Sequence, residues 1–418
     1  MSLLVTGGTL VTQDAARRVV RGNLFVEESR IVEVGETDRA ADRSLDAAGC
    51  LVMPGLVDGY TRTAHLLLGP PRDVPWPDME RAMRDLEAGL TKRDLEVAAA
   101  LATANMLASG TTCFLDLFRW EEEVGRAVTQ AGIRALLAWA VESEEDLPQA
   151  RRFLRRMRDR DRILPLVGLP GLTDPELTTA VADLARTEET RWCLPLAERR
   201  SEVYRFQRVA GSRPVDWLEK AGLLSPQLLA FHCVWLTLNE IRALARGHVA
   251  TIHCPGSNQM TGAGGPMALP EMLREGVVVG LGTDSPFLGG GFDLRGVMGA
   301  CGPVHRGTRW DPAIVPARVL LDLGTRGGAE ALGRGAGGLQ AGATADFVVV
   351  EPLTASPVTA HEGLSFLVYG GPALRVRDVV VNGELVVEGG VVLGFDVTDL
   401  RERVADLRRE LGLASPGD

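Results

Sequence analysis

The sequence has no apolar run that approaches the ~20 residues a membrane-spanning helix needs. Its first segment, MSLLVTGGTLVTQDAARRVV, also lacks the basic stretch followed by an apolar stretch that is typical of a secretory leader. We therefore expect a cytoplasmic protein that does not use a membrane as a partner.

Lysine is also scarce, although arginine is abundant. The net charge is −10, lysine occurs only at Lys92 and Lys220, and no basic stripe is present. Such a chain is a poor partner for nucleic acid or for an anionic membrane surface. The content of 45% apolar and 24% charged residues is that of an ordinary globular protein. A small-molecule substrate or ligand is therefore the expected partner.

The cysteines are dispersed rather than grouped, and most lie in apolar runs. They are Cys50, Cys113, Cys193, Cys233, Cys254 and Cys301. This pattern favours reduced thiols in the core of the protein over disulfide bonds.

From residue 51 onward, apolar strand-like runs alternate with helical ones. Eight strands are expected, at residues 51–58, 111–116, 134–141, 163–169, 192–197, 228–233, 249–254 and 277–284. Eight strand-helix units favour an α/β fold, a (β/α)8 TIM barrel over residues 54–340. An open doubly wound sheet is the alternative, but no glycine-rich dinucleotide fingerprint follows the first strand. Thr91 and Asp94 predict the start of one helix, and Gly110 its end.

The two chain ends differ from this pattern. Residues 1–53 and 341–396 contain short strand-like runs separated by Gly and Asn turns. We expect them to fold together as a small β-sandwich beside the barrel. Residues 397–418 should form a C-terminal helix and tail, because leucine and valine recur at helical intervals there. The helix would pack on the barrel or on a second subunit, and a homodimer is expected.

Polar residues at the carboxyl ends of the strands are the candidates for function, because active sites of such barrels gather there. These residues are Tyr60 and Arg62 after the first strand, Glu198 after the fifth, His232 on the sixth, His253 on the seventh and Asp284 on the eighth. They have the composition of an active site.

Several stretches carry a resemblance to a known family. They are MPGLVD (53–58), LEAGLT (86–91), SGTTCFLD (109–116), HCVWLT (232–237), HCPGSN (253–258) and GLGTDS (280–285). Their order and spacing resemble the amidohydrolase superfamily, in its branch of nucleobase and S-adenosylhomocysteine deaminases and triazine chlorohydrolases. The resemblance covers residues 1–396. Any one stretch alone would be a weak signal, but the combination is specific.

The resemblance implies a divalent metal ion held by two histidines after the first strand, a histidine after the fifth and an aspartate after the eighth. The matching positions are occupied by Tyr60, Arg62, Pro195 and Asp284. Proline has no donor atom, arginine stays cationic, and tyrosine could ligate only as a phenolate. We therefore expect no zinc or iron cofactor. Arg62 would replace the charge of the metal through a guanidinium-carboxylate fork with Asp284.

The sequence does not favour either of two other kinds of metal site. A carboxylated-lysine binuclear site is not expected, because neither lysine lies at a strand end. His253 and the cysteines of the fifth to seventh strands lie near strand ends, but adjacent strand residues point to opposite faces. Buried core thiols are the expected interpretation.

By the same resemblance, Glu198 would protonate a ring nitrogen of the substrate, His232 would orient the attacking water and Asp284 would act as general base. With Arg62 they form the expected catalytic set. The expected substrate-binding set is Glu87, Tyr60, His253 and Trp235. Each residue also has a structural alternative, such as a hydrogen-bonded core histidine for His232 or a solvated helix face for Glu87.

Three functions remain open at this point. The first is a metal-free hydrolase or deaminase-like enzyme that acts on a small nitrogen-containing substrate, either heterocyclic or a cyclic amide. The second is a catalytically inactive relative that binds a small ligand or partners an active paralogue. The third is an ordinary zinc deaminase, which the three replaced ligands disfavour.

Overall fold

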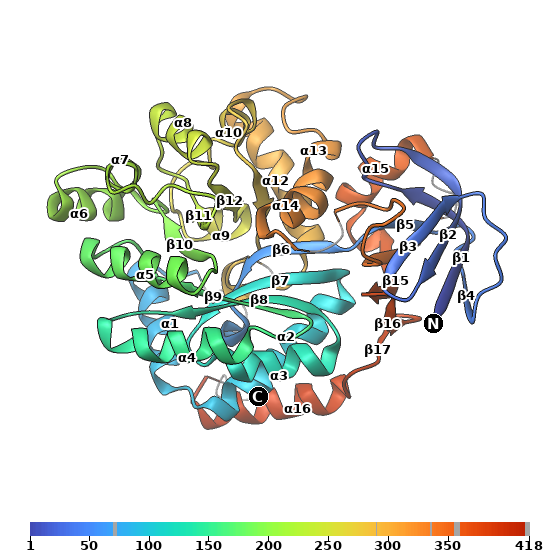
Figure 1. The fold of residues 1–418 in the computed structure, drawn as a ribbon, viewed down its shortest axis with the longest axis horizontal. Coiled ribbons are helices and arrows are strands. Elements are labelled where there is room, and N and C mark those ends of the chain that lie inside the picture. Colours follow the sequence, from blue (N-terminus) through green and yellow to red (C-terminus); the bar gives the residue numbers. More distant parts are fainter. Residues whose placement is uncertain (70–72, 290, 335–336, 355–359, 414–418) are drawn as a thin grey trace.

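The computed structural model of the chain describes residues 1–69, 73–289, 291–334, 337–354 and 360–413. The expected tail at 414–418 lies outside these residues. Figure 1 shows two parts: a barrel surrounded by helices, and beside it the strands contributed by both chain ends. The described helices include none that is long and apolar enough to cross a membrane.

Eight parallel strands form the barrel, in the order β13-β12-β11-β10-β9-β8-β7-β6. Their bounds are Leu56–Thr61 (β6), Thr111–Phe118 (β7), Arg134–Ala140 (β8), Ile163–Gly168 (β9), Trp192–Leu196 (β10), Leu228–His232 (β11), Ala250–His253 (β12) and Val279–Leu281 (β13). An isolated parallel bridge between Thr61 and Asp284 joins the first strand to the last. The barrel is therefore nearly closed, as the sequence predicted.

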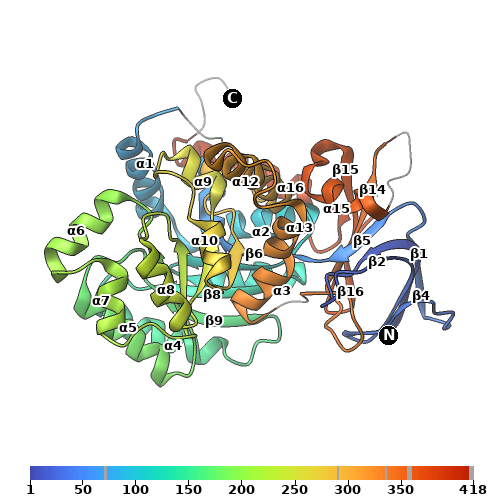
Figure 2. The ribbon, with the colours of Figure 1, turned by 90° about the horizontal axis from the view of Figure 1, so that it is seen from above.

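Helices cover the outside of the barrel, and Figure 2 shows this layer from above. Their bounds are Trp76–Gly89 (α1), Lys92–Ala108 (α2), Glu121–Ala131 (α3), Leu147–Met157 (α4), Pro175–Thr187 (α5), Arg200–Ala210 (α6), Pro214–Lys220 (α7), Leu238–Arg246 (α8), Pro255–Met260 (α9), Leu269–Arg274 (α10), Pro286–Gly289 (α11), Leu294–Arg309 (α12), Ala317–Asp322 (α13) and Gly328–Leu332 (α14). The predicted start of α2 is confirmed, because Thr91 and Asp94 form a reciprocal capping box.

The strands of both chain ends form one mixed sheet, in the order β17-β16-β15-β14-β5-β1-β2-β3, with β4 paired to β1. Their bounds are Ser2–Val11 (β1), Val19–Glu27 (β2), Arg30–Gly35 (β3), Arg43–Asp46 (β4), Leu51–Pro54 (β5), Phe347–Pro352 (β14), Leu374–Val381 (β15), Glu384–Glu388 (β16) and Val391–Val392 (β17). The two ends fold together as expected. Their hydrogen bonds join the strands into one continuous sheet, and residues from both chain ends share one apolar core.

The first predicted strand, 51–58, is in fact two strands. Its first half, β5, pairs with β1 and β14 in the terminal sheet, and its second half, β6, pairs with β7 in the barrel. Gly55 lies between them, where its backbone N–H donates to Asp346 O at 3.0 Å. The apolar run continues through this point because both strands are fully buried.

The last helix, Val397–Glu410 (α16), lies along the barrel beside α2. Leu400, Val404 and Leu407 are its buried face, and Arg408 Nε donates to Leu67 O at 3.1 Å. The helix predicted for the C-terminal segment therefore packs on the barrel of its own chain.

Candidate active site

A cavity of about 240 Å³ opens at the carboxyl ends of the barrel strands. It is lined by Tyr60, Arg62, Trp76, Glu80, Met83, Arg84, Glu87, Pro170, Pro195, Glu198, Glu202, His232, Asp284, Ser285 and Leu288. Six of the residues predicted from the sequence are among them: Tyr60, Arg62, Glu87, Glu198, His232 and Asp284. The structure therefore brings most of the predicted set to one place.

Backbone hydrogen bonds beside the cavity also close the barrel. Asp284 N donates to Tyr60 O at 2.8 Å, and Arg62 N donates to Asp284 O at 3.3 Å. Asp284 has a φ of 55°, a left-handed conformation that is uncommon for a residue other than glycine. Such backbone conformations concentrate at functional sites, where the surrounding structure holds them.

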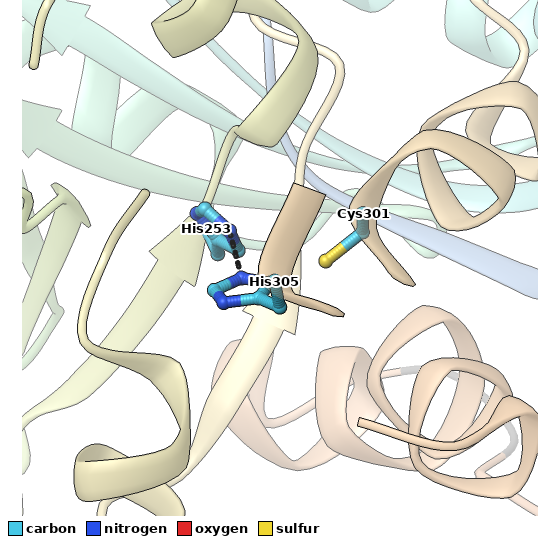
Figure 3. A group of neighbouring side chains, drawn as sticks. All are labelled: His253, Cys301 and His305. Atoms are coloured by element: carbon cyan, nitrogen blue, oxygen red, sulfur yellow. Dashed lines mark hydrogen bonds between the residues drawn. The ribbon is translucent and has the colours of Figure 1, made fainter. Parts of the chain in front are cut away.

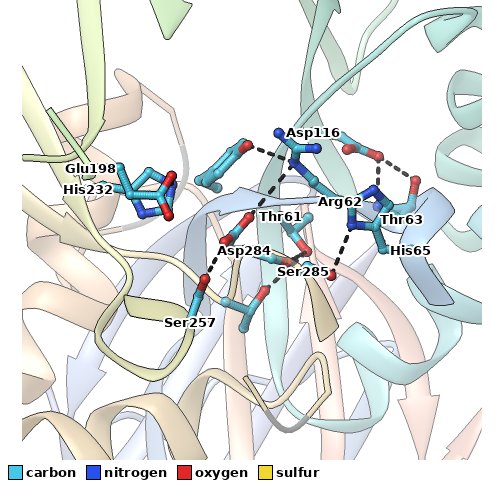
Figure 4. Close-up of polar contacts among 12 residues, drawn as sticks. Thr61, Arg62, Thr63, His65, Asp116, Glu198, His232, Ser257, Asp284 and Ser285 are labelled. Atoms are coloured by element: carbon cyan, nitrogen blue, oxygen red, sulfur yellow. Dashed lines mark hydrogen bonds and ion pairs between the residues drawn. The ribbon is translucent and has the colours of Figure 1, made fainter. Parts of the chain in front are cut away.

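Arg62 lies at the centre of the polar contacts in this cavity (Figure 4). Its Nε donates to the Tyr60 hydroxyl at 2.9 Å, and its Nη1 donates to Glu87 Oε1 at 3.1 Å. The predicted ion pair with Asp284 is present, with Nε 3.8 Å from Oδ1. The expected two-point fork is wrong, because Arg62 reaches Asp284 through this single longer contact while Tyr60 and Glu87 take its nearer hydrogen bonds.

Glu87 is the main ionic partner of Arg62, and it also contacts His65. Its Oε1 accepts from His65 Nε2 at 2.8 Å, and His65 Nδ1 lies 2.9 Å from Ser285 Oγ. Burial alone would raise the pKa of Glu87, but the His65 hydrogen bond and the Arg62 charge lower it to about 2. Glu87 is therefore an ionised, fixed carboxylate and not a solvated helix residue.

His65 was not assigned a role by the sequence analysis. It lies on the short helix η1 (Thr63–Leu68), directly after β6, and is fully buried. The available signal was its position a few residues beyond the polar end of the first strand. Ser257 and Asn258 were missed in the same way, although both belong to the HCPGSN stretch that marked the family resemblance.

Tyr60 is a buried wall of the cavity. Its ring stacks on Phe231 with centroids 4.1 Å apart and meets the His232 ring edge-on at 5.7 Å. Burial raises the pKa of its hydroxyl well above the ordinary value, although the nearby Arg62 charge opposes that shift. The hydroxyl is therefore protonated at neutral pH.

Asp284 and His232 are held by groups from the loop after β12. Ser257 Oγ donates to Asp284 Oδ2 at 2.5 Å, and His232 Nδ1 lies 2.8 Å from Asn258 Oδ1. Because an amide oxygen can only accept, the His232 proton resides on Nδ1. Its Nε2 then presents a lone pair, 3.7 Å from Glu198 Oε2.

Glu202 adds a second acid to the same side of the cavity. Burial and the neighbouring charge of Glu198 together raise its pKa to about 7. Its carboxylate accepts from Arg199 N at 3.3 Å at the start of α6. The cavity therefore contains one carboxyl group that changes charge near neutral pH.

Two predicted substrate-binding residues do not line this cavity. His253 points away from the barrel interior, and its Nε2 lies 3.2 Å from His305 Nε2 of α12. Trp235 packs against the following loop, where its Nε1 donates to Ala263 O at 2.6 Å. His253 was a candidate because it ends a strand, but adjacent residues of a strand point to opposite faces of the sheet.

Comparison with known proteins places the chain. The profile of the Amidohydrolase family matches residues 51–386. The chain belongs to the amidohydrolase family. It is 34% identical to a 5-methylthioadenosine/S-adenosylhomocysteine deaminase of Syntrophobacter fumaroxidans, in an alignment of 432 positions that covers 98% of both chains. It is 32% identical to a 5'-deoxyadenosine deaminase of Methanosarcina barkeri, again over 98% of both.

Solved structures of amidohydrolase-like proteins agree with this placement. An adenosine deaminase of Xanthomonas campestris, solved with bound zinc, has a TM-score of 0.93 and 25% identity over 99% of both chains. Atrazine chlorohydrolase of Arthrobacter aurescens TC1, complexed with zinc, has a TM-score of 0.86 at 23% identity, over 97% of this chain and 100% of that one. By family, the chain is a hydrolase, and the relatives it matches in sequence are named as deaminases.

Proposed function

We propose that the chain is a metal-free hydrolase of the deaminase type, acting on a small nitrogen-containing heterocycle or cyclic amide. One observation carries the proposal: Arg62 lines a cavity together with Glu198, His232 and Asp284, and its Nε lies 3.8 Å from Asp284 Oδ1. A cation fixed by the protein would take the place that the family resemblance gives to a metal ion.

The donor chemistry of this cavity does not fit the zinc ion of the structural relatives. Of the four positions that the resemblance gives to the metal ligands, Pro195 offers no donor atom and Arg62 is a permanent cation. Tyr60 is held protonated by burial. Asp284 is the one remaining anionic donor of the four, and a single carboxylate is far from the three or four ligands that zinc takes.

Arg62 has donor capacity left for a substrate. The nearer hydrogen bonds of its side chain use Nε and Nη1, and within the described residues none uses Nη2. Burial would lower the pKa of Arg62, but the Glu87 and Asp284 carboxylates and the hydrogen bond to Tyr60 raise it above its ordinary value. We infer that Nη2 stabilises the negative charge that develops on substrate oxygen or nitrogen in the transition state.

His232 is the best placed base in the cavity. Its Nδ1 donates to Asn258, so Nε2 is free to accept a proton from an attacking water. Glu198, 3.7 Å away, would hydrogen-bond or protonate the ring nitrogen of the substrate. Asp284 already accepts from Ser257 and contacts Arg62, so we assign it to positioning the water and Arg62 more than to proton transfer.

The relatives indicate the first substrates to test. Those proteins are named for the deamination of 5-methylthioadenosine, S-adenosylhomocysteine, 5'-deoxyadenosine and adenosine. Without a metal-bound hydroxide, attack by water relies on general-base assistance worth ~10²–10⁴-fold. We therefore expect slow turnover, or a substrate with a more reactive leaving group than the amine of adenosine.

The first experiment tests the metal. Wild-type protein and Asp284→Asn, both purified without chelator, are compared by elemental analysis for zinc, iron and nickel. We expect no metal whose presence depends on Asp284. About one ion per chain in the wild type that is missing from Asp284→Asn would overturn the metal-free proposal.

The second experiment tests the chemistry. Adenine nucleosides, other purines, pyrimidines, triazines and cyclic amides are screened for product formation with chelator present. We expect chelator-insensitive turnover that His232→Gln and Asp284→Asn each abolish, while His248→Gln, an exposed histidine outside the cavity, leaves it unchanged. Full turnover in both cavity variants would remove this cavity as the catalytic site.

A non-catalytic ligand-binding function is the second candidate, favoured by the loss of every histidine among the expected metal ligands. It predicts binding without turnover. Calorimetry with the same compounds separates the two functions, because Arg62→Met would then weaken binding while no compound is consumed. Neither turnover nor binding in the complete screen would count against both candidates.

A further inference from the structure

A second cluster of ligand-type side chains lies on the opposite side of β12 from the active-site cavity. His253 ends β12, while Cys301 and His305 lie one turn apart on α12, and Figure 3 shows all three pointing toward one another. Each is fully buried. Ile252 and Cys254 belong to the apolar cluster inside the barrel, so the alternation of the strand turns His253 outward, toward α12.

The spacing of the cluster suits a metal ion. Nε2 of His253 lies 3.2 Å from Nε2 of His305, and the three ligand atoms lie within 4.8 Å of one another. Two imidazole nitrogens bound tetrahedrally to one zinc ion, each at ~2.0–2.1 Å, are about 3.3 Å apart. A small movement of the Cys301 side chain would bring its sulfur to the same ion.

The contact between the two histidines leaves hydrogen-bonding groups unsatisfied. One proton can be shared between the two Nε2 atoms, but Nδ1 of His253 and Nδ1 of His305 are buried without a partner in the described part of the chain. Two polar rings buried in this way cost stability unless a further interaction compensates them.

We propose that His253, Cys301 and His305 bind one thiophilic metal ion, Zn²⁺ or Cu⁺. Two imidazoles and a thiolate are the donors that such ions prefer. On binding, the Cys301 S–H bond breaks, its proton passes to solvent and a metal–sulfur bond forms. The imidazole proton between the rings moves to an Nδ1, so that both Nε2 lone pairs face the ion. The ion would join the end of β12 to α12.

The protonation states of the three groups are consistent with this step. Burial lowers the pKa of His305 to about 4 and lowers that of His253 as well, so both imidazoles are neutral at pH 7. Burial also raises the pKa of Cys301 to about 12, so the thiol is protonated until a metal displaces its proton.

Metal binding to the full-length protein tests the proposal. Chelator-treated protein is titrated with Zn²⁺ and, under anaerobic conditions, with Cu⁺, each against a competing chromophoric chelator. Co²⁺ serves as the spectroscopic probe, because a thiolate ligand gives it a charge-transfer band in the near ultraviolet. We expect one ion per chain, a Co²⁺–thiolate band and a higher Tm in the presence of the preferred ion. Comparison of the two titrations identifies which ion that is.

Variants assign the ion to this cluster. Cys301→Ser and His305→Gln should each lose the Tm increase and at least about tenfold in affinity, and Cys301→Ser should also lose the thiolate band. Cys113→Ser is the matched control, because Cys113 is equally buried but lies inside the barrel. Cys301→Ala replaces Cys301→Ser if the serine variant does not fold.

Asp284→Asn separates this site from the active-site cavity and should retain the ion. No binding of either ion to the wild type would overturn the proposal. Binding that survives both Cys301→Ser and His305→Gln, or that is lost in Asp284→Asn, would overturn it equally.

Discussion

At the scale of single residues, Arg62 stabilises two acidic side chains inside one partly enclosed cavity. Its side chain is 20% exposed, and it contacts Glu87 at 3.1 Å and Asp284 at 3.8 Å. Solvent therefore screens these ion pairs less than it would screen pairs on the open surface. Removal of the cation leaves carboxylates whose charge is no longer compensated.

Arg62→Met should therefore lower the free energy of unfolding by about 1–3 kcal/mol, although methionine keeps the apolar stem. In a double-mutant cycle with Glu87→Gln, the two changes should be non-additive by about 0.5–3 kcal/mol, measured by urea unfolding. Additive effects would show that the contact between Arg62 and Glu87 carries no net stability.

Glu202 provides a pH-dependent prediction. Its folded pKa of about 7 lies above the ordinary value of 4.5, so the folded state holds its proton more tightly than the unfolded state does. The stability linked to this proton is fully present below pH 4.5 and is lost as the pH rises through about 7. Glu202→Gln removes that loss but keeps an acceptor for Arg199 N.

The measured quantity is the difference in unfolding free energy between Glu202→Gln and the wild type at pH 5, 6, 7 and 8. The variant should gain stability relative to the wild type across this range, because ionisation of Glu202 destabilises only the wild type. A difference that is constant with pH would mean that Glu202 has an ordinary pKa in the folded protein.

At the scale of elements, the junction between β5 and β6 depends on glycine. A Cβ on Gly55 would lie 2.0 Å from Thr112 Oγ1 and 2.3 Å from Thr112 Cγ2. Gly55→Ala should therefore displace β7 or β6 and lower the free energy of unfolding by about 1–3 kcal/mol in urea.

Gly307→Ala is the matched control for this change. Gly307 is exposed on α12, and a Cβ there meets nothing within 4 Å. Alanine in a helix interior should raise stability by about 0.5–1 kcal/mol. If both variants changed stability in the same direction, the close approach at Gly55 would not explain its effect.

The strands of the barrel could be predicted from sequence because each is a short, continuous apolar run between helices. The division at Gly55 could not, because both halves of the run are equally buried and apolarity does not reveal which sheet a strand joins. Closure of the barrel was expected from the eight strand-helix units. The sequence does not reveal that the bridge between Thr61 and Asp284 joins the first strand to the last.

The site could be predicted in part from the expected strand ends. Residues directly after strands, such as Arg62, Glu198 and Asp284, gather at one cavity because parallel strands end together. Partners that depend on side-chain direction were missed. His65, on a short helix, contacts the cavity residues Glu87 and Ser285, whereas His253, at a strand end, points away toward α12.

At the scale of the whole molecule, the close likeness to a zinc-bound relative predicts that the scaffold can accept a metal site again. A variant combining Tyr60→His, Arg62→His and Pro195→His would place three imidazoles beside Asp284. We expect it to bind about one zinc ion per chain by elemental analysis, lost on a further Asp284→Asn change. Arg62→His alone should bind none at this cavity. Failure of the folded triple variant to bind zinc would contradict the residue-by-residue match.

Two expectations about the whole chain remain predictions. A cytoplasmic location and a homodimer were expected from the sequence. Size-exclusion chromatography with light scattering measures the oligomeric state directly, and a mass near 44.8 kDa would contradict the homodimer. The helix α16 is already packed on its own barrel, so any dimer contact has to use another surface or the outer face of that helix.

We expect the bridge that closes the barrel to affect how long the folded protein persists. Opening between β6 and β13 breaks the hydrogen bond from Asp284 N to Tyr60 O and moves Asp284 away from Arg62. A ligand that contacts both Asp284 and Arg62 would therefore hold β6 and β13 together and oppose this opening. Its presence should slow amide exchange at Asp284 and lengthen the half-life of the native state under protease challenge. Occupancy of the cavity would then protect the protein from degradation even when the bound compound is never converted.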